Sequence, residues 1–358
     1  MIPTIGFFNS KRGVGTTSLV YHLAWMYADQ EYRVLAVDLD PQADLTAEMV
    51  DVERLEALWS SGGGDTIYGA LRRAMEGGDQ IASPHRESIA GNLELLAGDL
   101  SISDFEDELA SQWSRCLDGN EHAFRAVTAF HRCIQEAAEA ALADVILVDL
   151  GPNLGPINRA ALLACHHIVV PVAPDLFALQ GLRNLGPVVC RWHDEWQERV
   201  SRSHLAGISL IKDTMRLAGY VVLQGAVRLD HPMHSPEGWW RPTPAADAIG
   251  PRGDGPASSA RTWISVIPDV YATATGLMNP AAEPSSDPHC LGLLKWYASL
   301  MPIAQEARKP VFHLRPADGA LGAHAVAARE ARKDYKDLAD RIGAATWHPG
   351  KPSRAAQR

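Results

Sequence analysis

The sequence predicts a single α/β domain with a mostly parallel sheet that helices cover on both faces. Short apolar runs alternate with stretches of helical periodicity along most of the 358 residues, as expected of strands joined by helical crossovers. Residues 145–148 (Val-Ile-Leu-Val) are apolar throughout rather than alternating, which is typical of a strand buried on both faces. Segments 2–8, 16–30 and 34–39 have the strand–loop–helix–strand order and the length of one parallel crossover.

The remaining elements continue this alternation. Further predicted strands lie at 93–97, 145–150, 167–173, 219–224 and 263–267. Further predicted helices lie at 46–60, 65–75, 101–142 (interrupted), 155–165, 178–200 and 322–343. Residues 228–262, rich in Pro, Gly, Ser and His, and the similar stretch 276–290 predict two long surface loops. We expect one domain over residues 1–345 and a flexible tail over 346–358.

The composition is that of an ordinary globular protein. The net charge of -10 argues against a protein whose main work is to grip a nucleic-acid backbone, although it leaves room for a local basic patch. The five cysteines are scattered without a C-x-x-C spacing, which predicts buried, reduced thiols. The first residues resemble a strand rather than a signal peptide, and no apolar run approaches the roughly 20 residues needed to cross a bilayer. We therefore expect a cytoplasmic protein.

A glycine-rich segment joins the first predicted strand to the first predicted helix. Residues 11–18 read Lys-Arg-Gly-Val-Gly-Thr-Thr-Ser. Glycines let the backbone fold around an anion, and N–H groups at the helix start then face phosphate oxygens. The usual phosphate-binding loop has a lysine where this chain has Thr16, so one charge-assisted contact worth roughly 1.5–3 kcal/mol is missing. By itself the segment could also be a glycine-rich turn without a ligand.

Three carboxylates lie where predicted strands end. Asp38 and Asp40 are two residues apart, so on a strand they would face the same way, and Asp149 follows the apolar run 145–148. Ligands of α/β sheets bind at the carboxyl ends of the strands, and carboxylates there can hold Mg²⁺ through water. Each feature alone could instead be a solvated strand end or a helix cap.

Together these motifs resemble the ParA/MinD family of deviant-Walker ATPases. Lys11-Arg-Gly-Val-Gly-Thr-Thr-Ser18 is similar to the family's K-G-G-V-G-K-T-T, and Asp38-Leu-Asp-Pro-Gln42 to its D-x-D-P-Q. Asp149-Leu-Gly-Pro-Asn-Leu-Gly155 resembles D-x-P-P-S-L-G. The likeness covers roughly residues 3–340, and its other segments are Asn92-Leu-Glu-Leu-Leu96, Pro171-Val-Ala-Pro174, Ala178-Leu-Gln-Gly-Leu182, Val266-Ile-Pro268 and Lys309-Pro-Val-Phe312.

The resemblance implies a P-loop NTPase fold that binds ATP and Mg²⁺ and forms a homodimer with ATP. Lys11 would be the signature lysine that reaches the partner's nucleotide, and Asp40 would orient the attacking water. Thr17 would coordinate Mg²⁺, with Asp38 and Asp149 supporting the metal. The other residues implied to bind nucleotide are Arg12, Gly13, Val14, Gly15, Thr16 and Ser18, with Gln224, Pro268 and Asp269 around the base.

The chain also departs from the family's pattern. Thr16 replaces the loop lysine, Arg12 replaces a glycine, and Gly151 and Asn153 replace Pro and Ser in the switch segment. The variant loop resembles BcsQ-type relatives tied to cellulose secretion. Two functions therefore remain open: an ATP switch that partitions or positions DNA or a protein assembly, and a hydrolysis-poor ATP-binding scaffold of a secretion or defence system. We expect a protein partner, weak nonspecific DNA binding and no membrane binding.

Three further features have weaker interpretations. His166-His167 is expected to be an ordinary pair at a helix end rather than a metal site. Trp239-Trp240 predicts an aromatic plug on the core or, alternatively, a partner contact. The 322–343 helix predicts a solvated face of mixed charge, with a DNA-binding face as the alternative.

Overall fold

The structure is a computed structural model that describes residues 1–347 with several gaps. The gaps are 61, 63, 77, 79–80, 204–210, 225–255, 278–279, 282 and 296, and for residues 224 and 256–263 only the backbone is described. Trp239, Trp240 and most of the predicted 228–262 loop therefore lie outside the described residues, as do residues 348–358 of the predicted tail.

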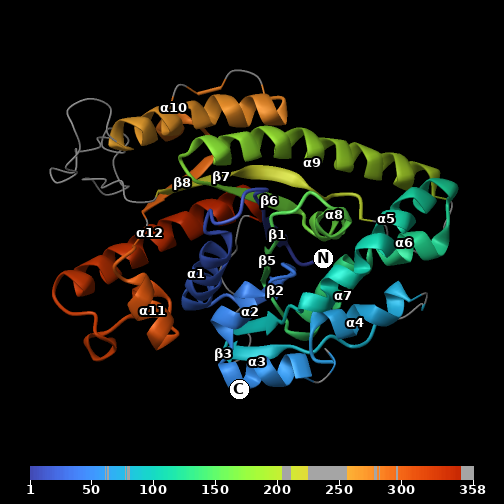
Figure 1. Ribbon diagram of the computed structural model, residues 1–358, viewed down its shortest axis with the longest axis horizontal. Helices are drawn as coiled ribbons and strands as arrows, with labels where there is room; N and C mark the ends of the chain where they lie inside the picture. The colour runs from blue at the N-terminus through green and yellow to red at the C-terminus, as the bar shows by residue number, and fades with distance from the viewer. Residues whose placement is uncertain are drawn as a thin grey trace.

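An eight-stranded sheet runs through the centre of the molecule in the order β3-β4-β2-β5-β1-β6-β7-β8 (Figure 1). All neighbouring strands pair in parallel except β3 and β4, which are antiparallel. The strands are β1 (Thr4–Phe7), β2 (Val34–Asp38), β3 (Glu87–Ala90), β4 (Leu93–Leu96), β5 (Val145–Asp149), β6 (His167–Val172), β7 (Arg216–Gln224) and β8 (Cys290–Lys295). The predicted α/β domain with a mostly parallel sheet is confirmed.

Helices cover both faces of the sheet (Figure 1). One face carries α4 (Ile67–Met75), α5 (Glu106–Arg115), α6 (Glu121–Val127), α7 (Ala129–Ala140), α8 (Pro156–Leu163), α9 (Leu176–Arg202) and α10 (Pro256–Thr275). The other carries α1 (Thr16–Asp29), α2 (Asp44–Met49), α3 (Val52–Ser60), α11 (Met301–Ala307) and α12 (Ala323–Thr346).

Two hydrophobic layers, one on each side of the sheet, account for this arrangement. In β5, Ile146 and Val148 point into one layer, whereas Val145 and Leu147 point into the other. All four side chains are fully buried, because successive residues of a strand face opposite sides and helices cover both. The uninterrupted apolar run in the sequence is the direct consequence.

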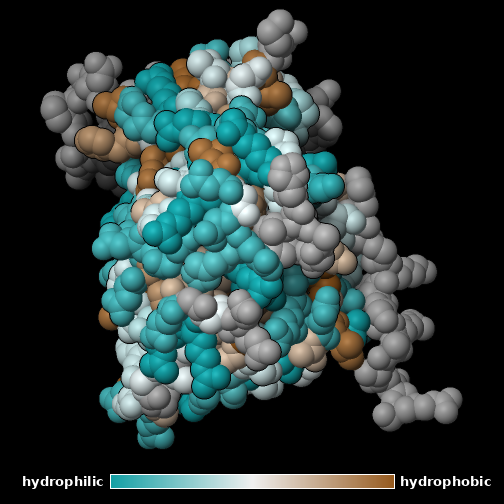
Figure 2. Space-filling view, turned by 90° about the vertical axis from the view of Figure 1, so that its right-hand side faces the viewer, coloured by the Kyte–Doolittle hydropathy of each residue, from teal (hydrophilic) through white to brown (hydrophobic). Residues whose placement is uncertain are grey.

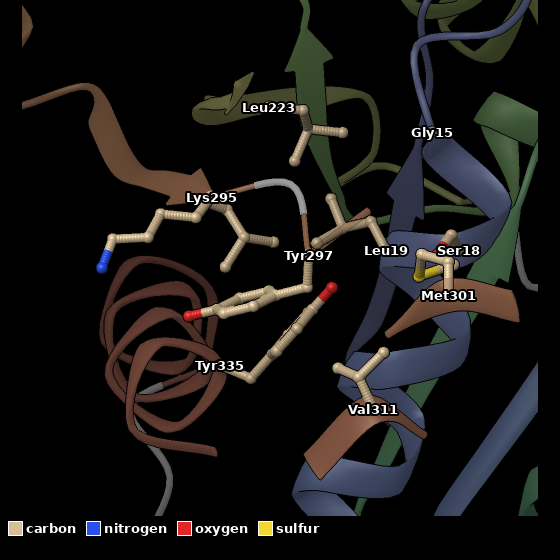
Figure 3. Close-up of a pocket in the computed structure, with 10 residues that line it drawn as sticks. Gly15, Ser18, Leu19, Leu223, Lys295, Tyr297, Met301, Val311 and Tyr335 are labelled. Atoms are coloured by element: carbon tan, nitrogen blue, oxygen red, sulfur yellow. The ribbon is translucent and has the colours of Figure 1, made fainter. Parts of the chain in front are cut away.

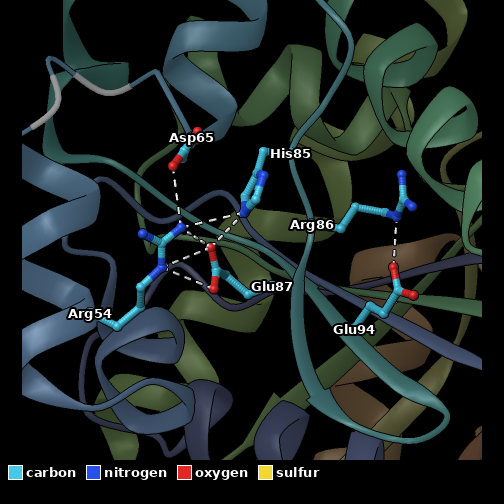
Figure 4. A network of polar contacts seen from close by, with 6 residues as sticks. All are labelled: Arg54, Asp65, His85, Arg86, Glu87 and Glu94. Atoms are coloured by element: carbon cyan, nitrogen blue, oxygen red, sulfur yellow. Dashed lines mark hydrogen bonds and ion pairs between the residues drawn. The ribbon is translucent and has the colours of Figure 1, made fainter.

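Charged side chains help to hold the antiparallel edge of the sheet, in addition to the apolar packing of Ile89 and Ala90 (Figure 4). Arg54 of α3 lies 2.5 Å from a carboxylate oxygen of Glu87 in β3 and 3.2 Å from Asp65. Arg86, just before β3, pairs with Glu94 of β4 at 2.6 Å. Charges on an edge strand disfavour pairing with another chain, so this network both anchors β3 and protects it.

The segment 263–267 was predicted as a strand, and this prediction is wrong. These residues lie inside α10, where Ile264, Ile267, Val270 and Tyr271 are buried at helical spacing, and α10 packs along α9. This mainly apolar run is so short that it fits the periodicity of a strand as well as that of a helix. The buried residues face α9 at helical spacing, which is the pattern of a helix. Residues 256–262 of the predicted loop form the first turns of the same helix.

Strands β3 and β8 were not predicted, and β8 begins at Cys290, the last residue of the predicted 276–290 loop. Within that loop, residues 283–289 are irregular apart from one short 3-10 turn at Pro284–Ser286. Helix α12 ends at Thr346, one residue beyond the predicted domain end. The domain boundary at residue 345 itself stays a prediction. In the part of the chain that the structure describes, no helix is long and apolar enough to cross a membrane.

The surface has the polar character that amphipathic covering helices produce. Figure 2 shows one side of the molecule as mainly hydrophilic, with apolar residues in small scattered patches. The predicted structural role of His166 fits its contacts, since its Nδ1 accepts a hydrogen bond of 3.0 Å from the backbone N–H of Thr4 in β1.

Candidate nucleotide-binding site

The glycine-rich segment forms an open loop between β1 and α1. Gly13 and Gly15 have φ angles of +74° and +91°, in the left-handed region that glycine enters without steric cost. The side chain of Val14 between them is buried and anchors the loop on the core. Gly15 is the N-cap of α1 and offers no side-chain acceptor, so the first N–H groups of the helix remain available for an anion.

A cleft of about 240 Å³ opens above this loop. It brings together most of the predicted phosphate-binding residues with Asp40, although they come from different parts of the chain. Its lining is Asn9, Lys11, Arg12, Gly13, Gly15, Thr16, Thr17, Ser18, Asp40, Asp44, Glu48, Leu150 and Pro152.

Two acidic residues of the cleft, Asp44 and Glu48, were not predicted from the sequence. Both belong to α2 and lie four residues apart, so they face the same side of the helix. Burial, followed by the charges of Asp44 and Asp38, raises the pKa of Glu48 to about 7. The i, i+4 spacing directly after the D-x-D-P-Q motif was the signal that could have identified them.

Asp38 ends β2, and its carboxylate accepts hydrogen bonds from residues of the segment that follows the strand. One oxygen accepts hydrogen bonds from the Thr46 hydroxyl at 2.7 Å and the Thr46 N–H at 2.8 Å, and the other accepts from the Asp40 N–H at 3.2 Å. Burial is the main cause that raises the pKa of Asp38 to about 7. Asp38 therefore holds the segment carrying Asp40 and α2 in place beside the cleft.

Asp149 ends β5 opposite Asp38 in the parallel register, but its environment is different. Its carboxylate is 1% exposed, and neither oxygen has a hydrogen-bond partner among the described residues. Burial and then the charge of Asp38 raise its pKa well above the ordinary value, while the hydroxyl of Thr17 acts in the opposite direction. A buried carboxylate without a partner is costly unless a ligand completes it.

The residues around Asp149 fit a magnesium ion. Carboxylate and hydroxyl oxygens are the hard donors that Mg²⁺ prefers, and two unpartnered oxygens of Asp149 lie beside Thr17. Within the described ranges, no three His, Cys, Asp or Glu side chains are arranged to hold a metal by themselves. Mg²⁺ commonly takes only one or two protein ligands and fills its remaining positions with water and substrate phosphates.

Lys11 makes an ion pair with Asp175, at 2.5 Å between Nζ and Oδ2. Asp175 is also the N-cap of α9, since its other oxygen accepts a hydrogen bond from the Ala178 N–H. A Cβ on Gly181 would lie 3.1 Å from Oδ1 of Asn9, so the first turns of α9 pack tightly on the loop. No local pattern in the sequence predicts the pairing of Lys11 with Asp175.

The switch segment after β5 packs against Asp40. A Cβ on Gly151 would lie 2.8 Å from an Asp40 oxygen, which explains why a glycine stands where the family pattern has proline. The side-chain amide of Asn158, in α8, donates to the carbonyl groups of Gly151 and Asn153 at 2.6 and 2.5 Å. The segment is thus tied both to the cleft and to the helix that follows it.

A second, smaller hollow adjoins the start of α1 (Figure 3). Its volume is about 20 Å³, and it lies between α1, the ends of β7 and β8, and α12. Tyr297 donates a hydrogen bond of 2.6 Å to Asp334 of α12. The lining residues are Gly15, Ser18, Leu19, Leu223, Leu294, Lys295, Tyr297, Met301, Val311 and Tyr335.

Of the three residues predicted around a base, one lies beside this hollow and two lie in a helix. Gln224 ends β7 and pairs with Lys295 of β8, so its backbone lies at the edge beside the hollow. Pro268 and Asp269 lie within α10, which packs on α9, and not at the end of a strand. Their place beside a base, which the resemblance implies, stays a prediction, although the strand expected just before them is part of a helix. The strands that reach the hollow are β7, through Leu223, and β8, through Leu294 and Lys295.

Comparison with known proteins shows which family this chain belongs to. The model of a family described as AAA domain matches residues 2–201. The chain belongs to this family. AAA-domain relatives include the putative replication protein A of Rhizobium rhizogenes, 31% identical over 185 residues that cover 51% of this chain and 42% of the relative. The cell division protein PomZ of Myxococcus xanthus is 28% identical over 183 residues, 50% of this chain and 49% of that protein. The chain therefore spans about half the length of these curated relatives.

Solved structures extend the likeness of the fold. A Corynebacterium diphtheriae protein of 28% identity has a TM-score of 0.56 and covers 62% of this chain and 83% of its own. A putative plasmid partition protein of Borrelia burgdorferi bound to AMPPNP has a TM-score of 0.54 and covers 96% of this chain and 98% of its own, at 14% identity. The AAA-domain chain thus has the fold of P-loop proteins, with ParA-like proteins among its relatives.

Proposed function

We propose that this chain is a ParA-like ATP switch, in which bound nucleotide joins two copies that position DNA or a protein assembly. The observation that carries the proposal is the cleft that combines a glycine loop with a free helix N-terminus, together with the unpartnered carboxylate of Asp149 that lies buried beside Thr17. The relatives point the same way, because they include a cell division protein and a virulence plasmid ParA family protein.

In this proposal the triphosphate lies on the loop from Gly13 to Ser18. The N–H groups of the loop and of the first turn of α1 bind the phosphate oxygens. Thr17 and Asp149 hold Mg²⁺, and Asp38 keeps the neighbouring segment in position. The bound ion neutralises charge on the β- and γ-phosphates. Asp40, beside the switch segment, orients the attacking water.

The adenine base lies at the hollow formed by β7, β8 and α12. Gln224 is at its edge, and Leu223, Tyr297 and Met301 supply an apolar and aromatic surface. The hollow of about 20 Å³ is smaller than a base, so side chains such as Tyr297 must shift when nucleotide enters.

In this proposal, Lys11 links the two copies of the dimer. It stands at the entrance of the cleft, where its ammonium is partly exposed and could reach the nucleotide of a second copy. We expect DNA to bind only weakly, because two of the cations of α12 are already paired with carboxylates. Arg332 lies 3.0 Å from Asp29, and Lys336 lies 2.6 Å from Asp340.

A second candidate function is a hydrolysis-poor scaffold in which ATP is retained rather than turned over. Thr16 favours it, because a short neutral side chain cannot follow the charge that develops on the γ-phosphoryl group. Both candidates require ATP binding and differ in turnover.

Nucleotide titration followed by phosphate release tests the two candidates on one preparation. The switch predicts ATP binding that needs Mg²⁺ and slow release that rises with a partner protein or DNA. Binding without release under any of these conditions would favour the scaffold, and absence of ATP binding would refute both. Binding to random duplex DNA should be weak, and its affinity should fall steeply as the salt concentration rises. A dissociation constant below about micromolar at physiological salt would contradict this expectation of weak DNA binding.

A further inference from the structure

The cleft contains more negative than positive side chains. Asp40, Asp44 and Glu48 line it, and the carboxylates of Asp38 and Asp149 lie buried behind them. A triphosphate brings further negative charge to this place, and Thr16 provides none of the compensation that a lysine would. Beside the bound Mg²⁺, a cation of the chain at the γ-phosphate would help it to distinguish ATP from ADP.

Lys11 does not fill this role in its own cleft. Its ammonium is engaged with Asp175 at 2.5 Å, and Asp175 is held in turn by the first turn of α9. The backbone N–H of Lys11 is fixed as well, by a hydrogen bond of 3.0 Å to the side chain of Asn9. Lys11 is thus directed toward α9 and away from its own loop.

Arg12 is placed differently. It lines the cleft and is exposed, and among the described residues no carboxylate lies within ion-pair distance of its guanidinium. Arg12 lines the same cleft as Asp40 and Pro152 of the switch segment.

We propose that Arg12 contacts the γ-phosphate of the ATP bound to its own chain and supplies the charge that is missing at Thr16. This inference rests on the proposed ATP-binding function. A guanidinium is always charged, and its planar fork can donate two hydrogen bonds to one phosphate group. The side chain is long enough to approach from the loop entrance, whereas a lysine at position 16 would approach from the helix start.

Arg12 would also act during hydrolysis. A water oxygen forms a bond to the γ-phosphorus, the bond from that phosphorus to the β,γ-bridging oxygen breaks, and ADP leaves with the electron pair. The proton of the water goes to the inorganic phosphate that is formed. Negative charge grows on the γ-phosphoryl oxygens and the leaving oxygen during this step, and a guanidinium at the γ-phosphate stabilises it.

The test compares ATP and ADP affinities, and single-turnover hydrolysis, for a set of loop variants. Arg12→Ala should weaken ATP binding about tenfold or more while changing ADP affinity less than about twofold, because only ATP has the γ-phosphate. Arg12→Lys should recover part of the loss, since it keeps the charge without the fork. Arg73→Ala, at an exposed arginine of α4 outside the cleft, is the matched control and should change neither affinity.

The decisive variant combines Arg12→Gly with Thr16→Lys, which moves the positive charge to the usual loop position. The double variant should regain most of the ATP preference and hydrolysis that Arg12→Gly loses. An unchanged ATP-to-ADP ratio in Arg12→Ala would overturn the inference and leave the proposed function intact. A wild-type protein that binds neither nucleotide would overturn the proposed function itself.

Mixing two inactive variants shows which copy Arg12 serves. Arg12→Ala and Asp40→Asn proteins are combined in equal amounts, and phosphate release is measured. With Arg12 acting on its own nucleotide, every site in a mixed dimer lacks one of the two groups, so activity stays low. Recovery toward about a quarter of the wild-type rate would mean that Arg12 acts across the dimer and would overturn the assignment, because half of the dimers are mixed and one site in each would be complete.

Discussion

The ammonium of Lys11 lies 2.5 Å from one oxygen of Asp175, and the other oxygen of Asp175 caps α9 through the N–H of Ala178 at 2.9 Å. One carboxylate thus restrains the loop lysine and starts the long helix. Both side chains are partly exposed, 28% for Lys11 and 38% for Asp175, so such a pair is worth roughly 0.2–1 kcal/mol. Lys11 must leave this pair before it can reach a nucleotide in a second copy.

Asp175→Asn should make ATP-dependent dimer formation easier. Asparagine keeps an oxygen that can cap α9 but removes the charge that restrains Lys11. We expect the ATP concentration at half-maximal dimer formation to fall about two- to fivefold, from the energy range of a partly exposed pair. Light scattering during an ATP titration measures this, with Asp194→Asn on the exposed side of α9 as the control. An unchanged midpoint would show that the pair does not restrain Lys11.

Thr16→Lys should raise hydrolysis more than ATP affinity. The backbone N–H groups of the loop already bind the ground state, whereas a lysine adds charge where the transition state needs it. The gain should be larger in an Arg12→Gly background than in the wild type, because Arg12 already supplies part of that charge. Single-turnover hydrolysis and nucleotide titration on the four proteins decide. Equal rates for wild type and Thr16→Lys, both already fast, would mean that Thr16 is fully compensated, for example by the partner's lysine.

Asp149→Asn should stabilise the protein in the absence of metal and nucleotide. The fold raises the pKa of Asp149, so at neutral pH the carboxylate is ionised more readily in the unfolded chain, and its burial costs stability above its unfolded pKa. Removing the charge should increase the free energy of unfolding by about 1 kcal/mol or more. Urea unfolding at pH 7 with EDTA measures this gain.

The same Asp149→Asn variant should lose the stabilisation that Mg²⁺ and ATP give to the wild type. A ligand that binds only the folded state raises stability, and the variant lacks the carboxylate that would hold the ion. A variant that is less stable without metal, or that gains as much from Mg²⁺ and ATP as the wild type, would contradict the role of Asp149.

His22 should make the protein less stable in mildly acidic solution. Its Nδ1 lies 2.7 Å from the Ser18 carbonyl oxygen, its Nε2 accepts a hydrogen bond from the Val311 N–H, and its ring stacks on Tyr335. Burial is the main cause that lowers its pKa to about 4. The unfolded chain, with an ordinary pKa near 6.5, binds more protons between these values, so stability falls as pH drops through that window.

The loss attributable to His22 is about 3 kcal/mol between pH 6.5 and pH 4, from the difference between the two pKa values. His22→Gln should remove this part of the pH dependence. His131, whose pKa burial also lowers to about 4, stays in both proteins, so their difference isolates His22. Parallel stability curves for the two proteins in urea titrations from pH 4 to pH 7 would refute this assignment.

The fold and half of the site could be predicted because they depend on local patterns. The apolar run ending in Asp149 specifies a buried strand, and the glycine pattern around Gly15 specifies the loop. The Asp175 partner of Lys11 could not be predicted, since the two residues are 164 positions apart and meet only through the packing of α9. The segment 263–267 was predicted wrongly as a strand because a five-residue, mainly apolar run fits a strand or a helix equally well.

The central claim is that ATP joins two copies of this chain through Lys11, and sedimentation velocity tests it most directly. The wild type and Lys11→Ala are compared without nucleotide, with ADP and with ATP, always in the presence of Mg²⁺. We predict that the wild type is a monomer without nucleotide and with ADP, that it becomes a dimer with ATP, and that Lys11→Ala remains a monomer throughout. A wild type that stays monomeric with saturating ATP, or a Lys11→Ala variant that dimerises as readily, would contradict the account.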